Sequence, residues 1–464
     1  MASDNPMDND DANGFDFNRE LEKILREFLS GSNPDSLKFL TEGTQGMPGI
    51  SFDPSSLGQI FSMFQSGANT SAGATGIDWS IARKTAIDVA KERAKPQDVP
   101  QLNATFSTAS LWVDEATVIG ASAVAPKEIT PVEWVQVTID TWIKIVEPVA
   151  EAISQVLLET FEQQVPEEIQ SQLSNISAMI TKVGGSMFAL QLGQIVGKLA
   201  TEVISGGDVG IPLTAKESHL GGTLIPENIP AFLDGISQSE TEVLLFLAAR
   251  ELAYARLFRH SKWLDSHVEA IVREYAAGIE IDMEHFHDLA SEFDPSDANN
   301  LQELMRNGSL IPPKTPRQEA AHERLETLIA LVDGWVDVVT ISATNRIPGS
   351  PAIAEMMRRR RATGGPSERA FATLIGLEMR PRKLREASVM WQLLEEKTDI
   401  STRDSLWAHP DLLPTKEEIE NPSLLVARVQ GKHLDDGSEN INFDQELAKL
   451  LEDNKDQDDN PEKS

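Results

Sequence analysis

The stretch QSETEVLLFLAARELAYARLFRH, residues 238–260, decides the fold more than any other part of the chain. From Val243 to Leu257 its residues are apolar on almost every face, whereas a helix on a protein surface is apolar on one face only. The stretch therefore predicts a helix that is buried at the centre of a domain. Ser237, followed three residues later by Glu240, fits a capping box and predicts where this helix begins.

A second long helix is predicted further along the chain. Thr315 fits the N-cap, Pro316 the first helical position and Gln318 the residue that reaches back to the cap. This helix is expected to run to about Val339. Elsewhere the apolar residues also recur with a period near 3.6, and only short pieces such as residues 222–225 have strand character. The sequence thus predicts a mainly α fold with little β-structure.

The composition divides the chain into three parts. Residues 77–430 are expected to form one large helical domain. Residues 1–76 are expected to be a flexible arm with one amphipathic helix, over 16–28, and a linker rich in Gly, Ser and Pro. Residues 431–464 hold many Asp, Glu and Asn residues and predict an acidic, disordered tail.

The composition also excludes several classes of function. The chain has 464 residues and no cysteine, which excludes disulfides, thiolate metal sites and a cysteine nucleophile. Its 41 Lys and Arg residues against 73 Asp and Glu give a formal net charge of −32, which disfavours binding to nucleic acid. The polar first residues and the absence of a long apolar run predict a cytoplasmic protein with no signal peptide and no membrane span.

Several motifs in the chain resemble the zincin-like metallopeptidases. They are GGSMF at 184–188, SGGDVGIPL at 205–213, DGWVD at 333–337 and GLEMRPR at 376–382, with shorter matches at 111–117 and 257–264. The resemblance covers about residues 80–425. It implies a helical zincin-like domain and the zinc-dependent hydrolysis of peptide bonds.

The resemblance also implies where a metal site would lie. Active members of that family carry H-E-x-x-H on a buried helix and a Glu followed by Gly on a later helix. Histidines at i and i+4 give zinc two nitrogen ligands, and the Glu beside the first one can deprotonate a bound water. The corresponding residues here are Arg250, Glu251 and Tyr254, with Asp333 at the later position. Glu251 keeps the general-base position, whereas the other three stand at former metal positions.

The replacements remove the ligands that zinc needs. Arginine has no lone pair to offer, and the phenol of tyrosine, with a pKa near ~10, ligates poorly at neutral pH. Asp333 can still ligate, although it is one methylene shorter than Glu. We therefore expect no bound metal, with zinc as the cofactor only if the family activity is retained. We expect Glu251 and Asp333 to approach each other, with Arg250 as the compensating cation and the Tyr254 hydroxyl donating to Asp333.

These replacements leave several functions open. The favoured hypothesis is a pseudoenzyme, a non-catalytic or weakly active relative that uses its cleft to bind an unidentified peptide or protein partner. The alternatives are an active metal-dependent peptidase with rearranged ligands, an enzyme of another chemistry, and a helical binding or scaffold protein.

Arg358–Arg361 form a run of four arginines, followed by Gly364-Gly365 and a predicted helix start. The favoured interpretation is that these arginines pair with the protein's own carboxylates, because the chain is strongly acidic. The alternative is a site for a phosphate at the start of the following helix.

The histidines and acidic residues offer two weaker candidates. His322, Glu326, Asp333 and Asp337 lie near one stripe of the second helix, which could bind a cation but is more typical of a solvated face. The histidines at 285 and 287 would point in nearly opposite directions on a helix, so a joint metal site is not expected.

Overall fold

A computed structural model describes residues 77–93, 102–164, 185–186, 188–213, 221–233, 237–279, 314–362, 364–377 and 382–431, with no side chains for 153–164. The amphipathic helix predicted over 16–28, the linker up to residue 76 and the tail from residue 432 lie outside these residues. The same is true of the histidines at 285 and 287.

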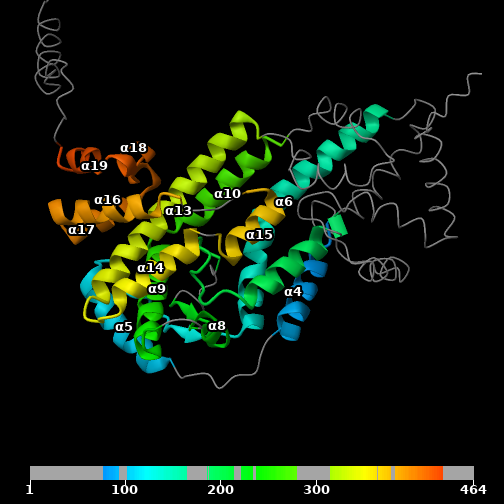
Figure 1. Cartoon of the computed structure of the whole chain (residues 1–464). Coiled ribbons are helices and arrows are strands. Elements are labelled where there is room, and N and C mark those ends of the chain that lie inside the picture. Colours follow the sequence, from blue (N-terminus) through cyan, green and yellow to red (C-terminus); the bar gives the residue numbers. More distant parts are fainter. Residues whose placement is uncertain are drawn as a thin grey trace, which may run out of the picture.

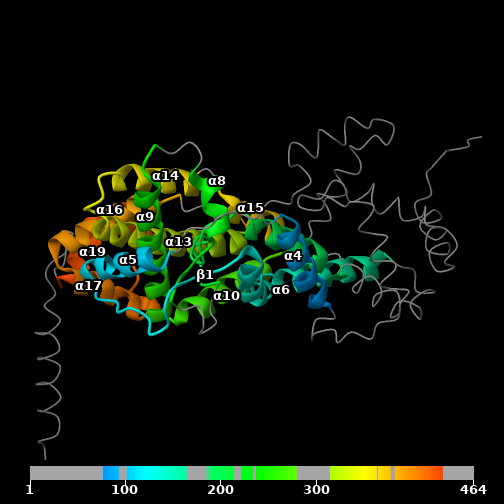
Figure 2. The same cartoon turned by 90° about the horizontal axis from the view of Figure 1, so that it is seen from below.

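Helices make up most of the described chain, which confirms the mainly α fold (Figures 1 and 2). The first group is α4 (Trp79–Arg93), α5 (Asn103–Ala116), α6 (Pro131–Gln164), α8 (Ile229–Leu233), α9 (Glu240–His260) and α10 (Trp263–Ala276). The second group is α13 (Pro316–Ala343), α14 (Ser350–Ala362), α15 (Pro366–Ile375), α16 (Leu384–Lys397), α17 (Ile400–Ser405), α18 (Lys416–Glu420) and α19 (Pro422–Val429). Residues 188–200 are helical as well, and short 3-10 turns occupy Pro226–Asn228, Leu406–Ala408 and Pro410–Leu412.

The described residues contain one small sheet. It consists of β1 (Lys127–Glu128) and β2 (Thr223–Leu224), which are parallel and pair Lys127 with Thr223. β2 lies within the piece that the sequence predicted as a strand. Ser205 adds an isolated antiparallel bridge to Leu224, so the glycine-rich loop 205–210 is fixed against β2.

α13 lies at the centre of the helical packing (Figure 1). It contacts α5, α9, α10, α14 and α16. Thr315 and Gln318 form the predicted capping box with Pro316 in the first turn, and the helix continues four residues beyond the expected end, to Ala343. The capping signal in the sequence was therefore sufficient to locate this helix.

α9 is the buried helix predicted from its apolar sequence. Its side chains from Val243 to Leu257 are almost all buried against α5, α13 and α14. The predicted capping box of Ser237 and Glu240 is wrong, because Ser239 is the N-cap and accepts a bond from the amide of Glu242. The correct cap is two residues further on, so that Glu240 and Glu242 both fall in the first turn, where the helix dipole favours them.

Glycines allow two close helix contacts. A Cβ at Gly334 would lie 2.8 Å from the Cβ of Ala387 and 2.9 Å from the amide nitrogen of Ser388, so only glycine lets α13 and α16 approach this closely. A Cβ at Gly193 or Gly197 would come within 2.7 Å of a carbonyl oxygen of α4. Packing thus explains the glycine of the DGWVD motif, Gly334, as well as Gly193 and Gly197.

Within the described ranges, no helix is both long enough and apolar enough to cross a membrane.

Candidate functional site

Arg250 and Tyr254 face the same way from α9, because residues four apart lie on one side of a helix. Both side chains are buried. Nη2 of Arg250 donates to the hydroxyl oxygen of Tyr254 at 2.9 Å, and the guanidinium lies 5.1 Å from the centre of the tyrosine ring. The two residues that the resemblance aligns with zinc-binding histidines therefore bind each other.

The carboxyl group of Asp333, on α13, contacts both of these side chains. The Tyr254 hydroxyl donates to Oδ1 of Asp333, as the sequence predicted, and Nη2 of Arg250 lies 3.8 Å from the same oxygen. Asp333 is fully buried. The structure thus brings together Arg250, Tyr254 and Asp333, the three residues that the resemblance implied as metal positions.

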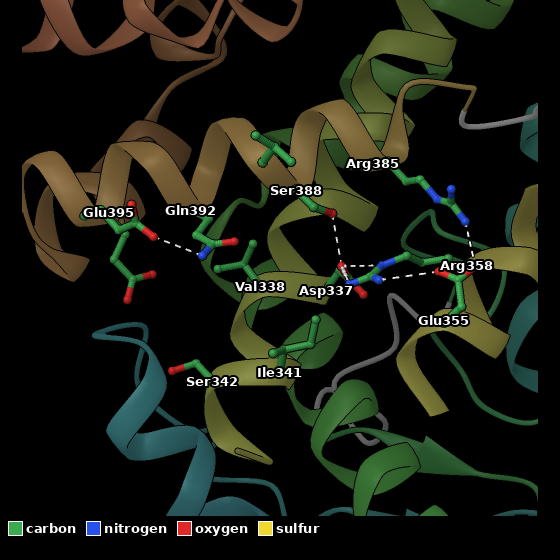
Figure 3. A pocket seen from close by; sticks show the side chains of 12 residues that line it. Asp337, Val338, Ile341, Ser342, Glu355, Arg358, Arg385, Ser388, Gln392 and Glu395 are labelled. Carbon is green, nitrogen blue, oxygen red and sulfur yellow. Dashed lines mark hydrogen bonds and ion pairs between the residues drawn. The ribbon is translucent and has the colours of Figure 1, made fainter. Parts of the chain in front are cut away.

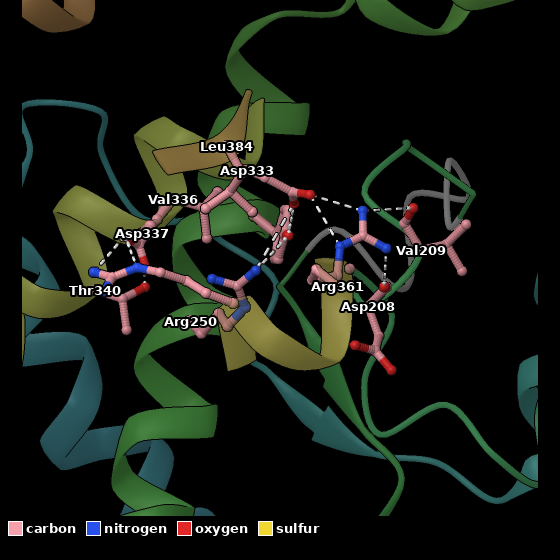
Figure 4. Close-up of polar contacts among 12 residues, drawn as sticks. Asp208, Val209, Arg250, Asp333, Val336, Asp337, Thr340, Arg361 and Leu384 are labelled. Carbon is pink, nitrogen blue, oxygen red and sulfur yellow. Dashed lines mark hydrogen bonds and ion pairs between the residues drawn. The ribbon is translucent and has the colours of Figure 1, made fainter. Parts of the chain in front are cut away.

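A second arginine, Arg361 of α14, makes the closer ion pair with Asp333 (Figure 4). Its Nε and Nη2 donate to Oδ2 of Asp333 at 3.0 and 2.7 Å. Its Nη1 donates to Glu368 of α15 at 2.8 Å and to the carbonyl oxygen of Asp208, and its Nη2 donates to the carbonyl oxygen of Val209. Arg361 is therefore the main cation at Asp333, a role that the sequence analysis had given to Arg250.

Glu251 is held by a different set of groups. Its Oε2 accepts from the amide of Gly207 at 2.9 Å, and its Oε1 accepts from the amide of Thr223 at 2.7 Å. The side chain is 3% exposed. Backbone amides, rather than an arginine, compensate this carboxylate. The loop 205–210 joins the two sets of contacts, because its amide at 207 binds Glu251 and its carbonyls at 208 and 209 bind Arg361.

Burial changes the acid–base behaviour of this region. It raises the pKa of Glu251 from 4.5 to about 7, although the amides of Thr223 and Gly207 oppose the shift. It also raises the pKa of Tyr254 well above its usual value, and the neighbouring Asp333 adds to this. Tyr254 is therefore a neutral hydrogen-bond donor at physiological pH.

The two arginines remain charged despite their burial. Desolvation alone would lower the pKa of Arg361, but the carboxylates of Asp333 and Glu368 raise it above its usual value. Burial also opposes the charge of Arg250, but its neighbours Tyr254, Asp333 and Asp337 together raise its pKa. The guanidinium groups of Arg250 and Arg361 and the neutral hydroxyl of Tyr254 surround the carboxyl group of Asp333. These four residues are called the Asp333 network.

The run Arg358–Arg361 pairs with the protein's own carboxylates, which confirms the favoured interpretation. Arg358 binds Asp337 at 2.9 Å, and Arg359 binds Glu355 at 2.9 Å. Arg360 binds Asp208 at 3.0 Å, and Arg361 binds Asp333 and Glu368. Three of the four arginines therefore link α14 to other parts of the protein, whereas Arg359 pairs within α14.

The acidic stripe predicted on the second helix is only partly solvated. His322 and Glu326 are partly exposed and lie 3.6 Å apart. Asp333 and Asp337 are buried and paired with arginines, so the expectation of a solvated face is wrong for them. The reason is that α13 is covered from both sides at this level, by α9 and by α16.

The sequence had not indicated Arg361, a member of the Asp333 network, or its partner Glu368 as site residues. The run of four arginines in so acidic a chain was the signal that could have found Arg361, because a buried acidic motif needs a cation. Among the residues that the structure describes, no three His, Asp or Glu side chains are grouped as a metal ion would require.

Comparison with known proteins identifies the family to which the chain belongs. The model of the family described as zincin-like metallopeptidase matches residues 77–426. The chain therefore belongs to the zincin-like metallopeptidase family.

The fold is also similar to a solved structure. A crystal structure from Chloroflexus aurantiacus, described as a candidate hydrolase with a novel fold, superposes with a TM-score of 0.51 and is 16% identical. The match covers 77% of this chain and 100% of the other, and at this identity it shows a shared fold alone. Among curated proteins, no sequence is significantly similar to this chain.

Proposed function

We propose that this chain is a zincin-like protein in which an internal salt-bridge network has replaced the zinc site. In this proposal it is a non-catalytic or weakly active relative of the metallopeptidases, and its scaffold binds a peptide or protein partner. The observation that carries the proposal is the placement of Arg250, at the first ligand position, against Tyr254 and Asp333.

The side chains at the ligand positions do not fit zinc. Arg250 has no lone pair and keeps its charge when buried. Tyr254 would have to ligate as a phenolate, but burial raises its pKa well above the usual value and its proton is donated to Asp333. Neither residue can replace an imidazole, whose neutral nitrogen is the ligand that zinc prefers.

Asp333 is the one ligand position that keeps a suitable chemical group, and both of its oxygens are engaged. Oδ1 accepts from Tyr254 and lies near Arg250, while Oδ2 accepts twice from Arg361. A dication at this carboxylate would meet two buried guanidinium groups at close range, which is strongly unfavourable in a region of low dielectric constant.

Glu251 is poorly placed to activate a water. A general base must hydrogen-bond the proton that it removes, and both oxygens of Glu251 already accept from backbone amides. Its side chain is almost inaccessible to solvent. Its retention is explained by its structural contacts, since it fixes the loop 205–210 and β2 to α9.

Metal analysis of the purified protein tests the proposal. The protein should be purified without chelator, exchanged into metal-free buffer and analysed by inductively coupled plasma mass spectrometry. We expect far less than about one zinc per chain and no chelator-sensitive peptidase activity. About one tightly bound zinc per chain, removed by chelator together with peptidase activity, would instead establish an active peptidase with rearranged ligands.

A further inference from the structure

The structure contains a cavity of about 540 Å³ between α13, α14 and α16, next to the Asp333 network but outside it (Figure 3). Its volume falls within the range typical of small-molecule and peptide sites. Charged residues line both of its ends, and apolar residues line its middle. A ligand that fits it would therefore carry charged groups at its ends and apolar groups between them.

One wall is a stripe of α16. Arg385, Val389, Gln392 and Glu396 line the cavity and are spaced by four, three and four residues, which places them on one face of the helix. Along the helix this face is basic, then apolar, then polar, then acidic. Val389 is 59% exposed, which is unusual for a large apolar side chain in this protein.

The end of the cavity near Arg385 holds two arginines, Arg358 and Arg385, and two carboxylates, Asp337 and Glu355. Arg358 binds Asp337, and both arginines lie within 3.7 Å of Glu355. The Arg385 side chain is 65% exposed, so its charge remains accessible from the cavity.

The opposite end carries an excess of negative charge. Glu395 and Glu396 both line it, and Gln392 donates to Glu396 at 3.0 Å. Glu395 pairs with the buried Arg403, which also binds Asp404 at 2.7 Å. One guanidinium is therefore shared between two carboxylates, and Glu396 adds a further negative charge.

This order of charges opposes the dipole of α16. A helix favours acidic residues in its first turn and basic residues in its last turn. On the cavity stripe, Arg385 lies in the first turn, whereas Glu395 and Glu396 lie in the last. Glu386 in the first turn and Lys397 in the last turn follow the dipole, so the reversed order is confined to the side of α16 that lines the cavity. A ligand with opposite charges at its two ends would match this order.

We propose that this cavity binds a short peptide with free termini. The carboxylate of the peptide lies at Arg385 and its amino group at Glu396, and its apolar side chains pack on Val389 and, across the cavity, on Val338 and Ile341. This inference rests on the proposed binding function and names its ligand class.

The length of the stripe gives the length of the peptide. Arg385 and Glu396 are eleven residues apart on one helix, which corresponds to roughly 16 Å at 1.5 Å per residue. An extended peptide spans about 3.3 Å per residue, so the two charges are about five residues apart. A pentapeptide therefore matches both ends.

Isothermal titration calorimetry with Ala-Leu-Ala-Leu-Ala tests the site. The full-length protein should be titrated with the peptide carrying free termini, with its N-acetylated form and with its C-amidated form. We expect the free peptide to bind, and each blocked form to bind about tenfold more weakly, because a charge-assisted hydrogen bond is lost.

Two charge reversals assign the ends. The Arg385→Glu variant should bind the C-amidated peptide and the free peptide equally weakly. The Glu396→Lys variant should bind the N-acetylated peptide and the free peptide equally weakly. The matched controls are Arg317→Glu and Glu386→Lys, which make the same charge changes at exposed positions outside the cavity lining and should bind like the wild type.

The proposal is overturned if the free peptide does not bind at millimolar concentration, if blocking the termini has no effect, or if the two reversals bind as well as their controls. Zinc content is measured on the same preparation. One zinc per chain would refute the loss of the metal site whatever the titration shows, and a metal-free protein that ignores the peptide would refute the cavity assignment alone.

Discussion

Arg361 of α14 donates from Nε and Nη2 to the same oxygen of Asp333 on α13, at 3.0 and 2.7 Å. The other oxygen of Asp333 receives the hydroxyl of Tyr254 from α9. A single buried carboxylate thus joins three helices, and in the proposed function it replaces part of a zinc site. A salt bridge can hold helices together as a metal does, but it cannot activate water.

Arg361→Ala is expected to lower the free energy of unfolding by about 3–5 kcal/mol, because it leaves Asp333 and Glu368 buried without their main cation. Urea denaturation would measure this loss. Arg359→Ala is the matched control within the same run. Its side chain is 74% exposed, and it should cost less than ~1 kcal/mol. Equal losses in the two variants would contradict the central role of Arg361.

Arg250→Ala is expected to cost less than Arg361→Ala, about 1–3 kcal/mol, because Asp333 keeps the closer of its two arginines. The Tyr254 hydroxyl loses a donor but still binds Asp333. Thermal melting of both variants under the same conditions gives the ranking. A larger loss for Arg250→Ala would show that the guanidinium at the former ligand position dominates the network.

Zinc affinity should return only when Asp333 is released. Arg250→His with Tyr254→His restores two imidazoles at i and i+4, but Arg361 still occupies Asp333. Adding Arg361→Met frees the carboxylate as a third ligand. Zinc should therefore raise the melting temperature of the triple variant more than that of the double variant, and should leave the wild type unchanged. A zinc-dependent rise of equal size in the wild type would mean that a metal site already exists.

The main features of the fold could be predicted from the sequence because they depend on local signals. The apolar run of α9 predicted its burial, and Thr315 with Pro316 and Gln318 predicted the start of α13. The start of α9 was placed wrongly because two serines precede it, each followed three residues later by a glutamate, so the spacing alone does not distinguish Ser237 from Ser239.

The site was predictable in part for the same reason. Arg250 and Tyr254 lie four residues apart on one helix, so their contact follows from spacing alone. The pairing of Asp333 with Arg361 depends on how α14 returns across α13, over a separation that carries no periodic signal. The exposure of the acidic stripe likewise depended on α16, which covers Asp337 from a distant part of the sequence.

Gly207→Ala is expected to disturb the network from the side of the loop. An added Cβ would lie 2.6 Å from the ring of Tyr254, so either the ring or the loop must move. We expect a loss of about 1–3 kcal/mol, typical of overpacking in a buried region. Gly120→Ala is the control, because nothing lies within 4 Å of its added Cβ. Unfolding curves of the two variants that coincide would contradict the close packing of this loop on α9.

Glu251 should make the stability of the protein depend on pH near neutrality. Its pKa is about 7 in the folded protein and near 4.5 when unfolded, so the folded state holds the proton more tightly. Its stabilising contribution is complete below about pH 4.5 and is lost as the pH rises to about 7 and beyond. The shift corresponds to at most about 3 kcal/mol.

Glu251→Gln removes this titration, and measuring it against the wild type cancels the contributions of other groups. In the glutamine variant an NH₂ group replaces one of the two oxygens that accept from the amides of Gly207 and Thr223, and it cannot accept a hydrogen bond. One backbone amide therefore loses its partner, which lowers the free energy of unfolding at every pH. The deficit of the variant is the amount by which its free energy of unfolding lies below that of the wild type. Because only the wild type loses the contribution of Glu251 as the pH rises, this deficit should shrink by up to about 3 kcal/mol between about pH 5 and pH 8. Urea unfolding at both pH values measures the deficit, with the exposed Glu386→Gln as the control, for which it should stay constant. A deficit for Glu251→Gln that also stays constant within ~0.5 kcal/mol would mean that Glu251 is ionised throughout, held by the amides of Gly207 and Thr223 more strongly than burial opposes it.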